Sequence, residues 1–131
     1  MPRYQMKTVV PNSFADAKAK VVEALKSQGF GILTEIDVQK TLKEKIGAEM
    51  EAYQILGACN PKLAQQALEI ERSIGLLLPC NVVLRELKEG TEVSIQDPQA
   101  MFEVVDPSTR ERLQPLAGEA RERLQQALRA L

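Results

Sequence analysis

The stretch 55–70, ILGACNPKLAQQALEI, changes from the pattern of a β-strand to that of a helix within two residues. Asn60 is a strong helix N-cap residue, and Pro61 is tolerated at the first position of a helix. A helix is therefore predicted to begin directly after Asn60, and Cys59 is predicted to end the strand. Any fold of this chain has to place a thiol at this joint between two elements.

The same alternation of strand and helix runs through the rest of the chain. Strands are predicted at 4–10, 30–37, 50–59, 81–87 and 91–96, the last two forming a hairpin around a tight turn. Helices are predicted after Ser13, at 38–47 and after Asn60, because capping residues or a terminal glycine mark their ends. A turn at Asp97-Pro98 leads into a small helical piece.

The tail is helical in composition from Ser108 onward, but Pro115 is predicted to break or kink it. We therefore expect the main C-terminal helix at about 115–131. Its apolar residues recur in steps of four and three, which matches a heptad seam but covers fewer than three heptads. We therefore expect a helix that packs on the sheet or on a second subunit, not a coiled coil.

A length of 131 residues predicts a single domain over 1–131. The order strand, helix, strand, strand, helix, strand is the ferredoxin-like βαββαβ order, here with an added hairpin strand and a C-terminal helix. The expected fold class is α+β, with two layers and the helices over one face of a mixed sheet. The other face also carries apolar residues, at positions such as Val9, Leu33, Tyr53, Ile55 and Val83. The terminal helix or a second subunit would have to cover them, so we expect a homodimer.

Composition excludes several classes of function. The chain has no histidine, which excludes Ser-His and Cys-His catalytic pairs and the commonest zinc sites. A net charge of −1 and an aromatic content of 4% give no reason to expect nucleic acid as a partner. No apolar run approaches the length of a membrane span, and the first ten residues do not resemble a signal peptide. We therefore expect a cytoplasmic protein without a membrane partner.

Two thiols, Cys59 and Cys80, admit two interpretations. A thiol at a helix start can be acidified and made reactive, whereas a buried cysteine is more often a small apolar residue. A parallel crossover would hold the two sulfurs about 20 Å apart, but residues 75–79 are long enough to return Cys80 to the side of Cys59. The sequence leaves both routes open, and we expect no disulfide.

Other candidate site residues have simpler structural roles. Cys59, Cys80 and Met101 carry the sulfur ligands that suit monovalent copper, but their spacing matches no compact metal motif, and Met101 more simply fills the core. Asp37 and Asp97 follow predicted strands and would serve a carboxylate hydrolase only if they met in one cleft. Asp97 is also typical of a turn, and Asp37 of a helix cap.

Four segments, GFGILTEID, LGACNPKLA, GLLLPCNVVL and DPQAM, resemble the family known as domain of unknown function 302. The resemblance runs from about Ser13 to Met101, and the Cys-Asn-Pro and Leu-Pro-Cys pieces are its most specific marks. It implies a compact α+β domain that occurs alone in small bacterial or archaeal proteins, and it leads us to expect a dimer; it implies no established activity. The positions that match the family pattern are Asp37, Cys59, Asn60, Pro61, Pro79, Cys80, Asp97 and Pro98.

These observations favour a non-catalytic homodimer that binds a ligand or partner near Cys59, Asn60 and Pro61. A ligand at a helix start would be a small anion, because backbone N–H groups and the helix dipole favour negative charge. The alternative is a thiol-dependent redox or soft-metal-handling protein that uses Cys59 with Cys80.

Overall fold

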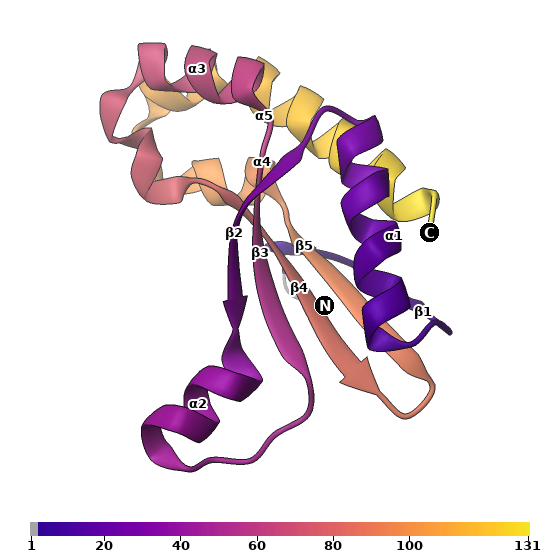
Figure 1. Ribbon diagram of the computed structural model, residues 1–131. Helices are drawn as coiled ribbons and strands as arrows, with labels where there is room; N and C mark the ends of the chain where they lie inside the picture. Colours follow the sequence, from indigo (N-terminus) through magenta and orange to yellow (C-terminus); the bar gives the residue numbers. More distant parts are fainter. Residues whose placement is uncertain (1–2) are drawn as a thin grey trace.

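The computed structural model describes residues 3–131 and contains one sheet and a layer of helices (Figure 1). The strands are β1 (Gln5–Val10), β2 (Gly31–Asp37), β3 (Tyr53–Cys59), β4 (Cys80–Leu87) and β5 (Gly90–Gln96). The α-helices are α1 (Phe14–Ser27), α2 (Val38–Ile46), α3 (Pro61–Ile70), α4 (Pro98–Met101) and α5 (Pro107–Arg129). Two 3₁₀ helices complete the chain, η1 (Arg72–Leu77) and η2 (Phe102–Val104).

The sheet has the strand order β1-β5-β4-β3-β2, and every neighbouring pair is antiparallel. The predicted α+β class and the order of elements along the chain are confirmed, but the prediction of a mixed sheet is wrong. The segment of α3 and η1 returns the chain to the end of the sheet from which it left. For this reason β4 runs back along β3 instead of crossing over parallel to it.

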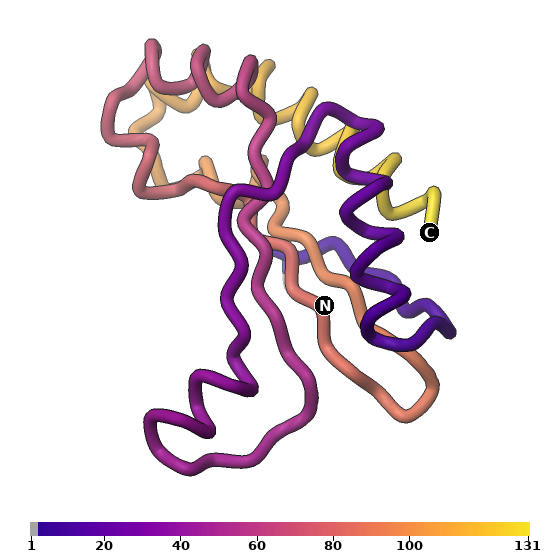
Figure 2. The backbone as a smooth tube through the Cα atoms, in the orientation of Figure 1, coloured from indigo at the N-terminus to yellow at the C-terminus, as the bar shows by residue number. Residues whose placement is uncertain are grey.

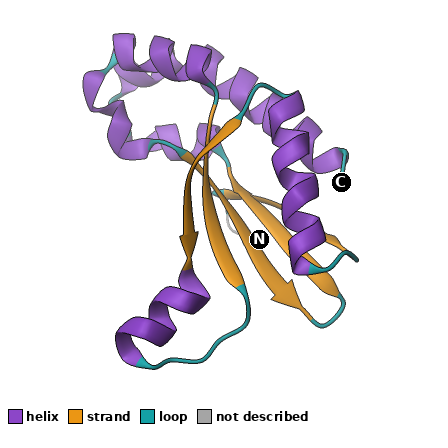
Figure 3. Cartoon of the chain, in the orientation of Figure 1, coloured by secondary structure: helices purple, strands orange, loops and turns teal. Residues whose placement is uncertain are grey.

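The long helices α1 and α5 cover one face of the sheet, and α3 packs on α5 beyond the sheet end (Figure 3). Strands β2 and β3 extend the other way and are joined through α2, which lies apart from the helical layer (Figure 2). The structure therefore has one covered sheet face and one open face.

The first core cluster forms between α1, the sheet and the second half of α5. Ser13 caps α1, accepting the Asp16 N–H, and the helix then buries Ala17, Val21 and Leu25 at the spacing of one helical face. Each inner strand contributes alternate residues to the same cluster, as period-two side chains must. These residues are Leu56, Ala58, Val82, Leu84, Val93 and Ile95.

A second core cluster lies beyond the sheet end, between α3, η1, η2 and the first half of α5. Its buried residues are Ala67, Ile74, Phe102, Leu113 and Ala117. Helix α5 belongs to both clusters, because Leu124 and Ala127 are in the first. One helix thus ties the two apolar cores together.

Helix α5 departs from prediction in two respects. It begins at Pro107 and continues through Pro115, so the predicted helix at about 115–131 is one part of a longer element. Pro115 is exposed, which places the missing backbone donor on the side away from both cores. The helix packs on the same sheet face as α1, so of the two covers considered for the other face, the terminal helix and a second subunit, it is not the one. Within residues 3–131, none of the helices has the length and apolar character needed to cross a membrane.

Candidate functional site

The joint between β3 and α3 lies where the sequence predicts it. Strand β3 ends at Cys59, Asn60 is the N-cap, and α3 begins at Pro61. The Leu63 N–H donates to Asn60 Oδ1 at 3.2 Å, and Asn60 is buried. The cap therefore fixes the direction in which the helix leaves the sheet.

A small cavity of about 40 Å³ lies directly beside this joint, between the two core clusters. Its walls come from β3, α3, the start of β4, α4, η2 and the middle of α5. The lining residues are Phe30, Ala58, Cys59, Asn60, Leu63, Ala64, Ala67, Leu78, Pro79, Cys80, Pro98, Phe102, Leu116, Ala117 and Ala120. The predicted candidates Cys59, Asn60 and Cys80 thus share one cavity.

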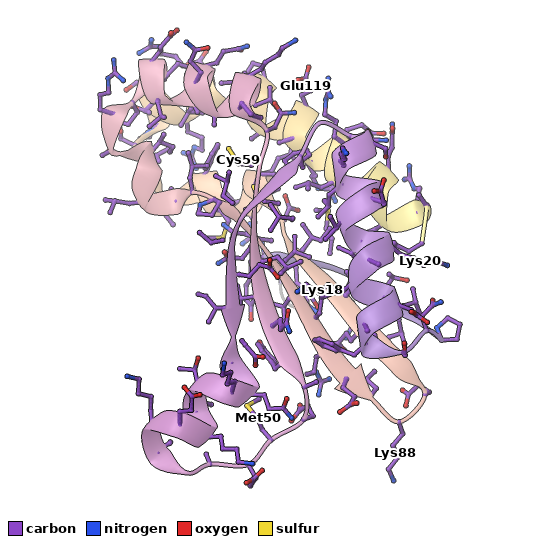
Figure 4. The ribbon with its side chains drawn as sticks, viewed as in Figure 1. Lys18, Lys20, Met50, Cys59, Lys88 and Glu119 are labelled. Atoms are coloured by element: carbon purple, nitrogen blue, oxygen red, sulfur yellow. The ribbon has the colours of Figure 1, made fainter. Side chains whose placement is uncertain are left out.

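Both thiols are free and both line the cavity. Cys80 begins β4 and pairs with Ala58, the neighbour of Cys59, so the chain takes the route that brings the two cysteines together. Figure 4 shows Cys59 at the end of the sheet nearest to α3. Cys59 is partly exposed and Cys80 is buried, so solvent has access to Cys59 first.

The environment of the thiols favours their protonated form. Partial burial raises the pKa of Cys59. Burial, and then the nearby charge of an ionised Cys59, raise the pKa of Cys80 to about 11. This is opposite to the acidification that a helix start can cause, because desolvation disfavours the thiolate. Both shifts disfavour a thiolate at neutral pH.

Gly57 is a feature of the site that sequence reasoning missed. A Cβ atom at this position would overlap Thr34 Oγ1 and lie 2.7 Å from Pro79 Cγ. Only a residue without a side chain lets Pro79 pass so close to β3. This approach brings the start of β4, with Cys80, up to the cavity.

Asp97 borders the cavity through its neighbour Pro98, and it has the turn role that the sequence predicts. Its Oδ1 accepts the Gln99 N–H at 2.9 Å, and its Oδ2 accepts Arg121 Nε–H at 3.0 Å. Asp97 thus caps α4 and pins α5 to the sheet end. The role of Arg121 could not be predicted from the sequence, because its partner Asp97 is 24 residues away and no local pattern relates the two.

Asp37 lies at the other end of the sheet, where it caps α2 by accepting the Lys40 N–H. Asp37 pairs with Gln54 of β3, which is in register through β4 with Val93 of β5. Val93 lies four residues before Asp97. Strand spacing and rise then separate Asp37 from Asp97 by roughly 20 Å. The two carboxylates do not meet in one cleft, as a hydrolase would require. Glu35, which lies inside β2, is paired with Lys18 of α1.

Met101 does not join the two thiols. It packs against the second cluster and borders a groove on the open sheet face, outside the lining of the small cavity. Among residues 3–131, no group of three or more cysteine, aspartate or glutamate side chains could hold a metal ion. Of the three sulfur residues Cys59, Cys80 and Met101, the cavity thus brings only the two thiols together.

A family model described as Domain of unknown function DUF302 matches residues 6–131. The chain belongs to this family. The solved structure of an uncharacterised conserved DUF302 protein from Bacillus stearothermophilus is 25% identical in sequence, with a TM-score of 0.87. The similarity covers 98% of each chain. No curated protein matches this chain.

The DUF302 match extends over every residue that lines the cavity, and over all five strands apart from Gln5. The resemblance suggested by the Cys-Asn-Pro and Leu-Pro-Cys segments is thereby confirmed. The DUF302 description names no activity, so the chemistry of the cavity has to be argued from its own residues.

Proposed function

We propose that this protein is a non-catalytic, homodimeric binding protein whose cavity, beside the helix start at Cys59, Asn60 and Pro61, accepts a small apolar molecule or the apolar end of a larger one. The observation that carries this proposal is the cavity itself, which lies at the predicted joint and is walled mainly by aliphatic and aromatic side chains. A concave apolar site with a few polar groups is the usual form of a ligand pocket.

The charge of the lining favours an apolar ligand over an anion. The residues that line the cavity include no lysine or arginine. In the first turn of α3, Leu63 donates to Asn60 Oδ1 and Ala64 to Asn60 O, while Pro61 has no N–H. An anion at this helix start would therefore depend on the Lys62 N–H.

The size of the cavity limits what enters it. A space of about 40 Å³ exceeds the roughly 10–15 Å³ that one water requires. It suits a group of a few heavy atoms. A larger ligand would place only its tip between α3 and α5, and the partly exposed Cys59 would contact the rest.

Xenon is a suitable probe, because apolar cavities in proteins bind it. We expect xenon pressure to shift the NMR signals of Leu63, Ala64 and Ala117, and inorganic phosphate to leave them unchanged. Ala64→Leu, which fills the cavity, should remove the xenon shifts. Ala19→Leu is the matched control, since Ala19 lies on an exposed helix surface.

Absence of xenon shifts in the folded wild-type protein would refute the apolar site. Shifts at Lys62 on addition of phosphate, without xenon shifts, would instead favour the anionic ligand first expected at the helix start.

A second candidate function is thiol redox or soft-metal chemistry, favoured by the two cysteines that share one cavity. It requires a thiolate at neutral pH, whereas the raised pKa values of Cys59 and Cys80 disfavour one. Titration with a chromogenic disulfide reagent distinguishes the two functions. Rapid reaction of native Cys59 near pH 7 would support redox chemistry, and thiols that react only after denaturation would exclude it.

A further inference from the structure

The open face of the sheet carries an apolar row that no sequence motif marks. Strand register places Ile36 opposite Ile55, Ile55 opposite Val83, and Val83 opposite Ser94. Three large aliphatic side chains therefore lie side by side on the face opposite α1 and α5. Ile36 is 49% exposed, whereas the strand residues on the covered face, such as Leu56 and Val82, are fully buried.

The polar residues beside this row are paired with one another. Arg85 makes two contacts of 3.3 Å with Glu92, and a further contact of 3.5 Å with Glu51. Lys7 Nζ lies 3.8 Å from Glu92 Oε2. Two cations thus balance two carboxylates, so a second face of the same kind would meet no net repulsion.

A groove of about 500 Å³ follows the same face, between the tyrosines Tyr4 and Tyr53 and the side chains of β4 and β5. Tyrosines are enriched at protein interfaces because they combine a large apolar area with a polar end. Tyr4 is 60% exposed. The groove makes part of this face concave, so side chains of a partner can fit into it.

The sheet face supplies most of the area that a stable interface needs. Five strands of about seven residues make an area of about 550 Å², from the strand spacing and rise. A stable interface uses roughly 800 Å² of each partner, so the contact has to extend beyond the sheet. Helix α2 extends the surface beyond the sheet, and it has no buried residue and an Ile46 that is 74% exposed.

We propose that the open sheet face, with the apolar row Ile36, Ile55 and Val83 at its centre, is the interface with a second copy of this chain. The inference rests on the homodimer of the proposed function and assigns its surface. A second copy suits this face in two ways. It covers the apolar row with an equal apolar row, and it brings a set of charges that is equally balanced. The cavity at Cys59 lies at the end of the sheet and is not needed for this contact.

Size-exclusion chromatography with light scattering tests the assignment. We expect wild-type protein at twice the 14.5 kDa chain mass. Val83→Lys and Ile36→Lys should each raise the dimer dissociation constant at least about tenfold, because each places a lysine in an apolar contact. Leu76→Lys is the matched control, because Leu76 is 88% exposed on η1, away from this face.

A monomeric wild-type protein would overturn the proposal, and so would a dimer that both lysine variants leave intact. Circular dichroism monitors folding. If Val83→Lys does not fold, the half-exposed Ile36→Lys decides the outcome alone. The mass measurement uses no ligand, so failure of the interface and failure of the xenon site are separate results.

Discussion

Asn60 shows how much one residue determines in this molecule. Its side chain caps α3, and its backbone carbonyl accepts the first helical hydrogen bond from Ala64. It is also one of the few buried polar residues, and it lines the cavity. The same atoms therefore end a strand, start a helix and shape the candidate site.

Asn60→Ala should lower the free energy of unfolding by about 1–2 kcal/mol, because the Leu63 N–H loses its acceptor in a buried place. Asn60→Ser, which retains a capping oxygen, should recover most of the loss. Urea denaturation measures both. Equal stability of the alanine variant and the wild-type protein would show that the cap has no energetic role.

Cys80 should make the stability of the protein depend on pH in the alkaline range. Burial raises its pKa from 9.0 to about 11, so the native state keeps the proton after the unfolded chain has lost it. The stabilising contribution is complete below about pH 9 and is lost as the pH rises from about 9 to about 11. The full difference is roughly 2–3 kcal/mol.

Cys80→Ala isolates this effect from the other groups that titrate in the same range. Urea denaturation at about pH 8.5 and about pH 10.5 should show a smaller loss of stability for the variant than for the wild-type protein. The same loss in both proteins would mean that Cys80 titrates normally.

At the scale of elements, α5 is the least expected part of the structure. A proline inside a helix removes one hydrogen bond, and Pro115 was predicted to break or kink the helix. Here Leu113 and Ala117 pack in the second cluster on either side of Pro115, while Leu124 continues into the first. Tertiary packing before and after the proline holds the helix continuous.

Pro115→Ala should therefore raise the free energy of unfolding by about 1–3 kcal/mol, because residue 115 regains an N–H that can donate to the Glu111 carbonyl. Gln114→Ala, at the adjacent exposed position, is the control and should change stability little. Thermal unfolding followed by circular dichroism measures the difference. A lower melting temperature of the proline variant would refute this account.

At the scale of the whole molecule, the two core clusters divide the structure into a sheet body and a helical end. They meet at the cavity and are joined through α5. Packing defects in one cluster should then loosen that part first, because local stability follows local apolar contacts.

Leu113→Ala removes a fully buried side chain of the second cluster and should cost about 2–5 kcal/mol. Native-state hydrogen exchange should quicken most in α3 and η1, and less in β3 and β4. Leu124→Ala, in the first cluster, should quicken exchange in the sheet and α1 instead. A uniform change in both variants would indicate one undivided core.

The sequence alone determined the order of the elements, most of their ends, and the joint beside which the candidate site lies. Caps at Ser13, Asp37 and Asn60, with apolar periods of two and of three to four residues, place strands and helices close to their observed bounds. A cap and an apolar period depend on residues within one helical turn of each other, so they can be recognised in a short stretch of sequence. The family resemblance followed from the segments around Cys59 and Cys80 and was confirmed.

Only the tertiary structure decided how distant segments meet. Antiparallel pairing of β3 with β4, the contact of Asp97 with Arg121, and the close approach of Pro79 to Gly57 each join residues 20 or more positions apart. Such contacts produce no periodic pattern in the sequence, because they depend on the path of all the residues that connect the two partners. The cavity and the uncovered sheet face exist only once those paths are fixed.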